Sequence, residues 1–466
     1  MTRYLAFAAV SLVLLLSAIS GTAVAVAFPV ITSSLDASLI LAGWVLSAYQ
    51  LVITTTMPLA GKASDVFGRK FIFMLSLSFF ILGSLLCAVA PNIQLLILSR
   101  VIQGIGGGGF LPSAAGIVAE QFPKSRQQAL GLFTSIYPIG MIIGPNLGGW
   151  MTSALGWRSV FWLNIPLGLV ALVAAALLLR SGQQRAERHI DLIGAGLFTG
   201  SLFAILAGLS QMGNGGTGLS WVLTGILFAA GLVFMVVFLR HESRARDPIL
   251  DLEVIRARPF VAANVFNFIY GAGVFGLFSF IPLYAVSVYG MSILASGLIL
   301  TPRSVGMMLA SAVTSIFLVR WGYRRPMLLG TSVVILCLVL LSIESQGVSI
   351  LGMQLSSTVL LLAIMGLLGL GMGTAAPAAN NACIELMPQR VATITGIRGM
   401  FRMAGGAVSI GVTSLLLNNI GDMARGFYIV FLGLAIVLLI TIPAIFVMPG
   451  SAEVPPSVRD ARQPGR

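Results

Sequence analysis

The chain alternates long apolar runs with short polar connections along its length. Each of fourteen runs approaches or exceeds the roughly 20 apolar residues that a helix needs to cross a membrane. The first run, within Met1–Pro29, also resembles a secretory signal because Arg3 precedes its apolar stretch. Since thirteen more runs follow, we interpret it as an uncleaved first helix. The expected spans are 5–31, 39–61, 71–90, 93–116, 128–151, 159–180, 191–212, 220–240, 260–288, 293–318, 325–343, 353–384, 391–417 and 426–448.

The composition agrees with a membrane protein. Of the 466 residues, 58% are hydrophobic and 9% are charged, whereas a soluble chain carries about 25% charged residues. Too few polar side chains are present to cover a water-facing surface, so the sequence predicts an all-α polytopic membrane protein. Cys87, Cys337 and Cys383 fall in apolar runs without metal-binding or disulfide spacing. They indicate packing roles, and we expect no metal and no cofactor.

Positive charge is distributed unevenly among the connections. The net charge is +13, and most of the 27 Lys and Arg residues lie in alternate connections. Arg69, Lys70 and Arg324 belong to this group, and Arg398 is counted with the connection before the thirteenth run. Because basic connections remain in the cytoplasm, both termini are expected there. The charge is therefore attributed to membrane orientation and not to a nucleic-acid partner.

The chain contains an internal repeat. The segments 104–123 and 369–388 align without a gap, and three glycines, two prolines and one glutamate coincide. A weaker match relates 65–70 to 319–324. Two like-oriented bundles predict a pseudo-twofold axis along the membrane normal, with a transport site between them. The expected domains are 1–180 and 260–449, each a six-helix bundle, 181–259, two inserted central helices with a cytoplasmic linker, and 450–466, a disordered cytoplasmic tail.

Five motifs occur on successive expected helices. They are GKASDVFGRK (61–70), RVIQGIGGG (100–108), GLFTSIYPIGMIIGPNLGG (131–149), WRSVFWLNIPLG (157–168) and HIDLIGAGL (189–197). In this order they resemble the major facilitator superfamily, in its fourteen-helix drug:proton antiporter branch. The resemblance implies a monomeric, proton-coupled secondary exporter of small amphipathic compounds. It also implies alternating access and a multi-pass location in a bacterial cytoplasmic membrane.

The first motif is interpreted as a gating loop. Its glycines permit a tight turn, Asp65 can accept bonds from the end of a neighbouring helix, and Arg69 and Lys70 suit the headgroup region. An ordinary basic loop is the alternative interpretation. The residues assigned to the loop are Gly61, Asp65, Gly68, Arg69 and Lys70.

The third motif carries a stripe of small residues. Gly140, Gly144 and Gly148 recur every four residues and therefore share one helix face, which permits close approach of another helix. The resemblance implies that this helix lies at the interface between the bundles, while ordinary packing between two helices is the alternative. The residues assigned to the antiporter motif are Gly131, Gly140, Gly144, Pro145, Gly148 and Gly149.

The sequence departs from the resembled branch where that branch usually carries a helix-1 acid, because Ser20 stands there. Three arginines lie instead inside expected spans, and no Asp or Glu reaches their depth. An intramembrane charge is a functional candidate, so a neutral or anionic substrate is favoured over a cation. Structural bonding of the arginines to helix 1, Gln103, carbonyls or water is the alternative. The central candidates are Arg100, Gln103, Arg303, Arg402, Ser20, Asn380, Asn381 and Tyr284.

Proton coupling then falls to acids near helix ends, Asp36, Glu120 and Glu385. For Glu120 and Glu385 a structural role in ending a helix is the alternative, since a proline follows each within a few residues. A lipid or organic-anion transporter of the same fold without proton antiport is the second interpretation of the whole chain. An enzyme or an ATP-driven pump is not indicated, because the sequence has neither a catalytic constellation nor a phosphate-binding loop.

Overall fold

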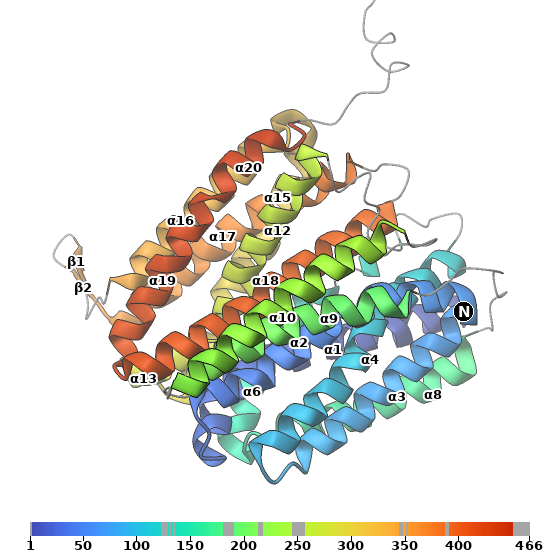
Figure 1. Ribbon diagram of the computed structural model, residues 1–466, viewed down its shortest axis with the longest axis horizontal. Coiled ribbons are helices and arrows are strands. Elements are labelled where there is room, and N and C mark those ends of the chain that lie inside the picture. Colours follow the sequence, from blue (N-terminus) through green and yellow to red (C-terminus); the bar gives the residue numbers. More distant parts are fainter. Residues whose placement is uncertain are drawn as a thin grey trace, which may run out of the picture.

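The structure is a computed structural model that describes residues 2–122, 129, 132–133, 136–179, 191–212, 218–244, 257–343, 348–350, 353–386 and 391–450. Two groups of helices stand side by side in Figure 1, the blue and cyan α3, α4 and α8 in one group and the yellow to red α15, α16 and α19 in the other. Their bounds are given in the next two paragraphs.

The first bundle is built from helices that begin at strong N-caps. Ser38 and Asn92 accept bonds from the first turns of α2 and α4, which satisfies amide groups that have no partner within the helix. The turn before α2 contains Asp36 in the left-handed region, at φ 45°. The elements are α1 (Thr2–Ser34), α2 (Leu39–Phe67), α3 (Arg69–Ala88), α4 (Ile93–Gln121), α6 (Ile136–Leu155), α7 (Ser159–Trp162) and α8 (Asn164–Leu178).

The second bundle follows the same plan with more interruptions. A π-helical segment, η2 (Ala272–Gly276), separates α12 (Arg258–Gly271) from α13 (Ile281–Tyr289). A short antiparallel hairpin, β1 (Val348–Ile350) and β2 (Met353–Leu355), precedes α17. The other helices are α14 (Ile293–Leu298), α15 (Leu300–Trp321), α16 (Arg324–Ser342), α17 (Ser357–Ile384), α18 (Val391–Ile420), α19 (Met423–Leu439) and α20 (Thr441–Val447).

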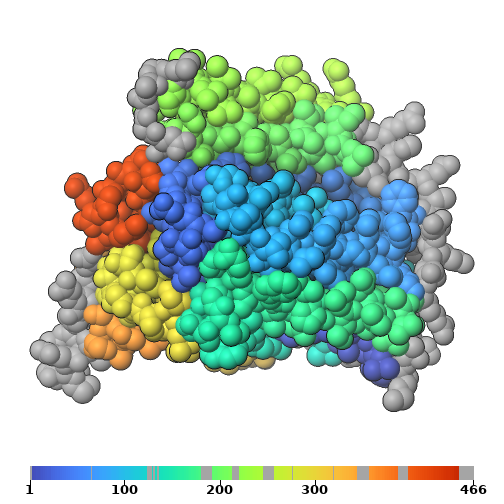
Figure 2. All heavy atoms as spheres, turned by 90° about the horizontal axis from the view of Figure 1, so that it is seen from below, coloured from blue at the N-terminus to red at the C-terminus, as the bar shows by residue number. Residues whose placement is uncertain are grey.

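The inserted helices, α9 (Leu192–Met212) and α10 (Gly218–Glu242), lie across the contact between the bundles. Helix α9 packs against both α2 and α18, and Thr199 of α9 donates to the Thr55 hydroxyl of α2 over 3.0 Å. Helix α10 packs on α9 and forms the green ridge along the top of Figure 2. Its outward face exposes large apolar side chains, among them Trp221, Ile226 and Val233, which suits contact with lipid.

Among the described residues, twelve helices are long and apolar enough to cross a membrane. The expected count of fourteen is therefore not confirmed. The two expected spans that fall outside the twelve have identifiable physical causes. Helix α6 contains four glycines, two prolines and an asparagine, which lower its mean hydropathy. The segment expected at 260–288 is divided by η2, so that neither of its α-helical parts is long enough alone.

The apolar core is continuous between the bundles at one end of the molecule. We call the end that carries Arg69, Lys70 and Arg324 the basic end, and the opposite end, with Asp36, the far end. Toward the far end, one cluster of buried side chains joins both bundles and includes Phe28, Phe280 and others. At the basic end, buried side chains of α1, α3, α4 and α8 form a cluster of their own.

Candidate functional site

Polar and aromatic contacts join the two bundles in the half of the molecule nearer the far end. Phe28 of α1 and Phe280 meet edge to face, with ring centroids 5.3 Å apart. Asn146 of α6 donates to the Thr301 hydroxyl of α15 over 2.8 Å, and Thr301 can donate to the Asn146 carbonyl oxygen over 3.0 Å. Ser304 adds a bond to the Met141 carbonyl at 3.2 Å. Helix α6 is therefore one of the helices that connect the bundles.

The glycine stripe of α6 faces α1, a helix of its own bundle. A Cβ on Gly148 would lie 2.6 Å from Ala23 Cα, and a Cβ on Gly144 would overlap the Thr22 hydroxyl. The alternative interpretation, ordinary packing between two helices, therefore describes the stripe itself. The stripe recurs every fourth residue, so all its members point toward one partner, and that partner is α1. Gly131 lies outside the described residues.

The contact with the other bundle uses the adjacent face of α6. A Cβ on Gly149 would lie 3.3 Å from the Ile293 carbonyl oxygen and from Leu294 Cα of α14. A Cβ added to Gly297 would meet the Pro145 carbonyl oxygen. Positions 145 and 149 are each one residue past a member of the stripe, which rotates them by about 100° around the helix. The motif thus serves two close contacts, one on each face.

The gating-loop motif contains a single-residue turn, and its basic side chains bond to the ends of neighbouring helices. Gly68, at φ +95°, is the only residue between α2 and α3, and a side chain at this φ would be strained. Lys70 Nζ donates to the carbonyls of Ala176 and Leu179, over 2.8 and 2.6 Å, at the end of α8. Such a cation is favourable at a helix C-terminus. Gly61 lies opposite Pro112 of α4, and the Asp65 side chain lies outside the described part of the structure.

The second bundle repeats these ties. Arg324, the repeat mate of Lys70, donates to the Phe446 and Met448 carbonyls at the end of α20, over 2.9 and 3.2 Å. Arg69 lies 3.2 Å from the carboxylate of Glu120, while its mate Tyr323 donates over 2.9 Å to Glu385, the mate of Glu120. Burial and the Glu385 carboxylate together raise the pKa of Tyr323. The weak sequence match thus corresponds to equivalent contacts.

Lys70→Gln and Arg324→Gln are each expected to lower the free energy of unfolding by about 0.3–1 kcal/mol through loss of the charge at a helix C-terminus. Because the ties lie in different bundles, the double variant should show the sum of the two effects. Thermal unfolding of the purified protein measures this. The matched control is Arg425→Gln, an exposed arginine at the far end, and an equal loss in that control would contradict the assignment.

Three central candidates of the first bundle belong to one buried polar network. Arg100 donates from Nε to the Val45 carbonyl over 3.0 Å, donates to Gln103, and stacks 3.7 Å from the Tyr49 ring centroid. Gln103 continues the network to Ser84 over 2.8 Å, and Asn164 joins Ser84 to Ser20. Arg100, Gln103, Ser20, Ser84 and Asn164 are at most 1% exposed. This placement favours the structural interpretation of Arg100, Gln103 and Ser20. Asn164 was not predicted, although it stands in the fourth motif.

The other two central arginines, Arg303 and Arg402, lie in the second bundle. Arg303 of α15 is 3% exposed, and its guanidinium lies 4.2 Å from the Phe278 ring centroid. Arg402 lies on α18, with Arg398 one helical turn before it. The assignment of Arg398 to a connection is therefore wrong, because α18 already begins at Val391. Tyr137 of α6, in the first bundle, lies within electrostatic range of both Arg303 and Arg402.

The remaining candidates differ in their surroundings. Tyr284 donates to the Leu341 carbonyl over 2.9 Å and packs against Phe427 and Phe431, inside the second bundle. Asn381 donates to the Pro377 carbonyl of its own helix over 2.9 Å. The carbonyl oxygen of Asn380 is buried without a hydrogen-bond partner in the described part of the chain. Asn380 therefore keeps a free acceptor, whereas Tyr284 and Asn381 are engaged locally.

None of the three acids expected to carry protons lies in the middle of the described bundles. Asp36 is exposed in the far-end turn, where its left-handed backbone is one that Asp tolerates better than most residues. Glu120 and Glu385 lie at the basic end, in the contacts with Arg69 and Tyr323 described above. All three therefore have an evident local structural role, and their part in coupling stays a prediction.

Comparison with known proteins identifies the family. The model of the Major Facilitator Superfamily matches residues 10–192 and 187–409. Multidrug transporter protein MdtP of Bacillus subtilis (strain 168) is 32% identical over 404 residues, covering 86% of this chain and 73% of that protein. The tetracenomycin C resistance and export protein of Streptomyces glaucescens is 30% identical over 422 residues, covering 89% and 76%.

A solved structure supports the fold. A mutant of the nucleoside transporter NupG superposes with a TM-score of 0.66 and 15% identity, covering 95% of this chain and 100% of that one. The matched family, the relatives and the two bundles agree on a multi-pass membrane transporter and not an enzyme. The chain belongs to the Major Facilitator Superfamily.

Proposed function

We propose that the chain exports small amphipathic compounds, drugs and antibiotics among them, from the cytoplasm by alternating access. The relatives named as a multidrug transporter and as a tetracenomycin C resistance and export protein support this function. The observation that carries it is the distribution of contacts between the bundles. They meet through small residues and a continuous apolar core near the far end, while the first bundle keeps a separate core at the basic end. Such an arrangement suits bundles that rock against each other.

The same proposal gives the chain fourteen crossings and two cytoplasmic termini in a bacterial inner membrane. Helix α6 has 20 residues, or about 30 Å at 1.5 Å per residue, enough for a bilayer core. The α12–η2–α13 segment extends over residues 258–289 and is interrupted, not ended, by its π-helical part. Arg69, Lys70 and Arg324 at the basic end favour a cytoplasmic location for that end. The contacts near the far end would then close the transport site toward the outside.

Proton antiport is the proposed energy source, and proteoliposomes test both parts of the proposal. The lumen of the proteoliposomes is made more acidic than the medium. Transporters whose cytoplasmic side faces the medium should then concentrate the cationic dye rhodamine 123 or the anionic dye fluorescein in the lumen. A pH-sensitive dye should report the accompanying efflux of protons from the lumen. Empty liposomes are the control. Dye uptake that persists unchanged without a pH gradient would favour the alternative, an organic-anion or lipid transporter without proton antiport. No movement of any dye would contradict export.

A further inference from the structure

We propose that Arg303, Arg398 and Arg402 form an anion-binding centre of the transport site, which takes the carboxylate or sulfonate group of an amphipathic compound. This inference rests on the proposed export function and names its substrate class. Tyr137 of the first bundle lies within electrostatic range of Arg303 on α15 and of Arg402 on α18, and Arg398 is one helical turn before Arg402. A ligand held there contacts both bundles, as alternating access requires.

The first argument is repulsion between like charges. Arg398 and Arg402 are one helical turn apart, and like charges at this spacing repel. Glu385, near the end of α17, accepts from the Tyr323 hydroxyl. A bound anion would relieve the repulsion, and the attraction is strengthened in a site removed from water.

The second argument is unused hydrogen-bonding capacity. The Nε groups of Arg303 and Arg398 are buried and have no hydrogen-bond partner within the described chain. Arg303 is itself 3% exposed, and a buried donor without a partner is costly. The Phe278 ring covers one face of the Arg303 guanidinium, which leaves the planar edge that binds carboxylate and sulfonate groups.

The third argument is that the backbones carrying the cluster are fixed. A Cβ on Gly369 of α17 would overlap the Arg303 carbonyl oxygen, and a Cβ on Gly271 would overlap that of Arg402. The backbones of Arg303 and Arg402 thus lie in tightly packed helix contacts, which limits the positions that their side chains can reach. An apolar residue at either position would fill the same space without the free-energy cost of burying a charge. Packing alone therefore does not account for these two arginines.

The surroundings suit the apolar part of such a ligand. Tyr270 stacks on Phe266, with centroids 5.4 Å apart, and its hydroxyl donates to the Met372 carbonyl over 3.0 Å. Together with Phe278 and Tyr137 these rings supply aromatic surface near the guanidinium groups. The expected ligand is a ring compound with an acidic group.

Two dyes with the same xanthene ring system and opposite charge separate this inference from a structural role. Binding of fluorescein and of rhodamine 123 to purified protein is measured by fluorescence anisotropy. Arg398→Gln is expected to weaken fluorescein binding at least about tenfold, as loss of a charge-assisted bond implies, and to leave rhodamine 123 binding within about twofold. Arg398→Lys should retain part of the affinity, and the exposed Arg425→Gln should match the wild type.

Equal weakening for both dyes, or unchanged fluorescein binding by a correctly folded Arg398→Gln protein, would overturn the inference. If that variant does not fold, as judged by gel filtration, Arg303→Gln replaces it with the same expected outcome. The proposed function is judged separately, by dye movement in proteoliposomes. Movement of rhodamine 123 without fluorescein binding leaves export intact and rejects the anion centre. Fluorescein binding without movement of any dye retains the anion centre and rejects export.

Discussion

Gly144→Val is expected to lower the initial rate of dye export at least about tenfold, while the protein still inserts and purifies in normal amount. The first added carbon overlaps the Thr22 hydroxyl and lies 3.0 Å from the Ile19 carbonyl oxygen, so α6 must move away from α1. Overpacking of this kind costs about 1–3 kcal/mol. The adjacent face of α6 contacts α14 and α15, and a displaced α6 changes the closing contact between the bundles.

The matched control is Gly433→Ala in α19, where no atom lies within 4 Å of the added carbon. That variant should be as active as the wild type and slightly more stable, because alanine favours a helix by about 1 kcal/mol over glycine. The double variant Gly144→Ala, Thr22→Ala should export faster than Gly144→Val, because Thr22→Ala removes the hydroxyl that lies nearest to the added carbon. Full export by Gly144→Val at normal protein levels would show that the close approach of α1 and α6 is dispensable.

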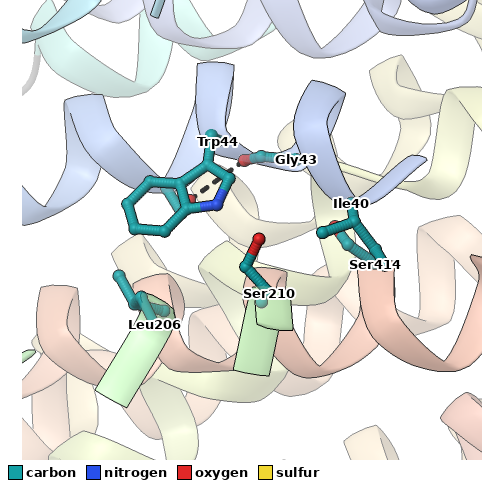
Figure 3. A pocket seen from close by; sticks show the side chains of 8 residues that line it. Ile40, Gly43, Trp44, Leu206, Ser210 and Ser414 are labelled. Carbon is teal, nitrogen blue, oxygen red and sulfur yellow. Dashed lines mark hydrogen bonds between the residues drawn. The ribbon is translucent and has the colours of Figure 1, made fainter. Parts of the chain in front are cut away.

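Gly43→Ala is expected to keep the bundles apart near the far end and to lower export at least about tenfold. The added carbon overlaps the Ser414 hydroxyl of α18 and lies 2.9 Å from Ser414 Cβ, and the next atom, of Ile410, is 4.0 Å away. At this point helix α2 therefore meets α18 through a single side chain. Beside them is a pocket of about 10 Å³, lined by Trp44, Leu206 and others, with room for about one water molecule (Figure 3).

Because the obstacle is one serine, a second substitution can remove it. Gly43→Ala combined with Ser414→Gly exchanges the small residue between the two helices and should restore export to within about twofold of the wild type. Distances between spin labels on the two bundles at the far end should lengthen in Gly43→Ala and return to the wild-type values in the double variant. Gly225→Ala in α10, with no atom within 4 Å, is the control. A double variant as inactive as Gly43→Ala would contradict this mechanism.

Helical periodicity predicted which residues share a face but not which helix covers it. Gly140, Gly144 and Gly148 were correctly placed on one close-packing stripe, yet the partner is α1 and not the other bundle. The choice between neighbours depends on the angle at which α6 crosses α1 and α14, a tertiary property. For the repeat, the match of Lys70 to Arg324 was informative because equivalent residues perform equivalent contacts.

Charge counting failed at one informative position. Arg398 follows a basic connection and was grouped with it, although α18 continues through it. The expected span 391–417 already contained Arg398, so the error arose in counting the charges of the connection and not in locating the helix. Ser20 illustrates a second limit, because its bond from Asn164 joins residues 144 apart in sequence. No local sequence pattern predicts such a pair, because only the packing of α1 against α8 brings Ser20 and Asn164 together.

The two inserted helices have a consequence for the route by which a membrane-dissolved compound reaches the centre. The bundles meet along two lines related by the pseudo-twofold axis, α2 with α18 and α6 with α14 and α15. Helices α9 and α10 lie over the first line, whereas the inserted pair does not cover the second. The fold therefore has a sheltered side and a side facing the bilayer directly. A compound dissolved in the membrane is therefore expected to approach the centre beside α6, α14 and α15, the line of contact that the described residues of α9 and α10 leave uncovered.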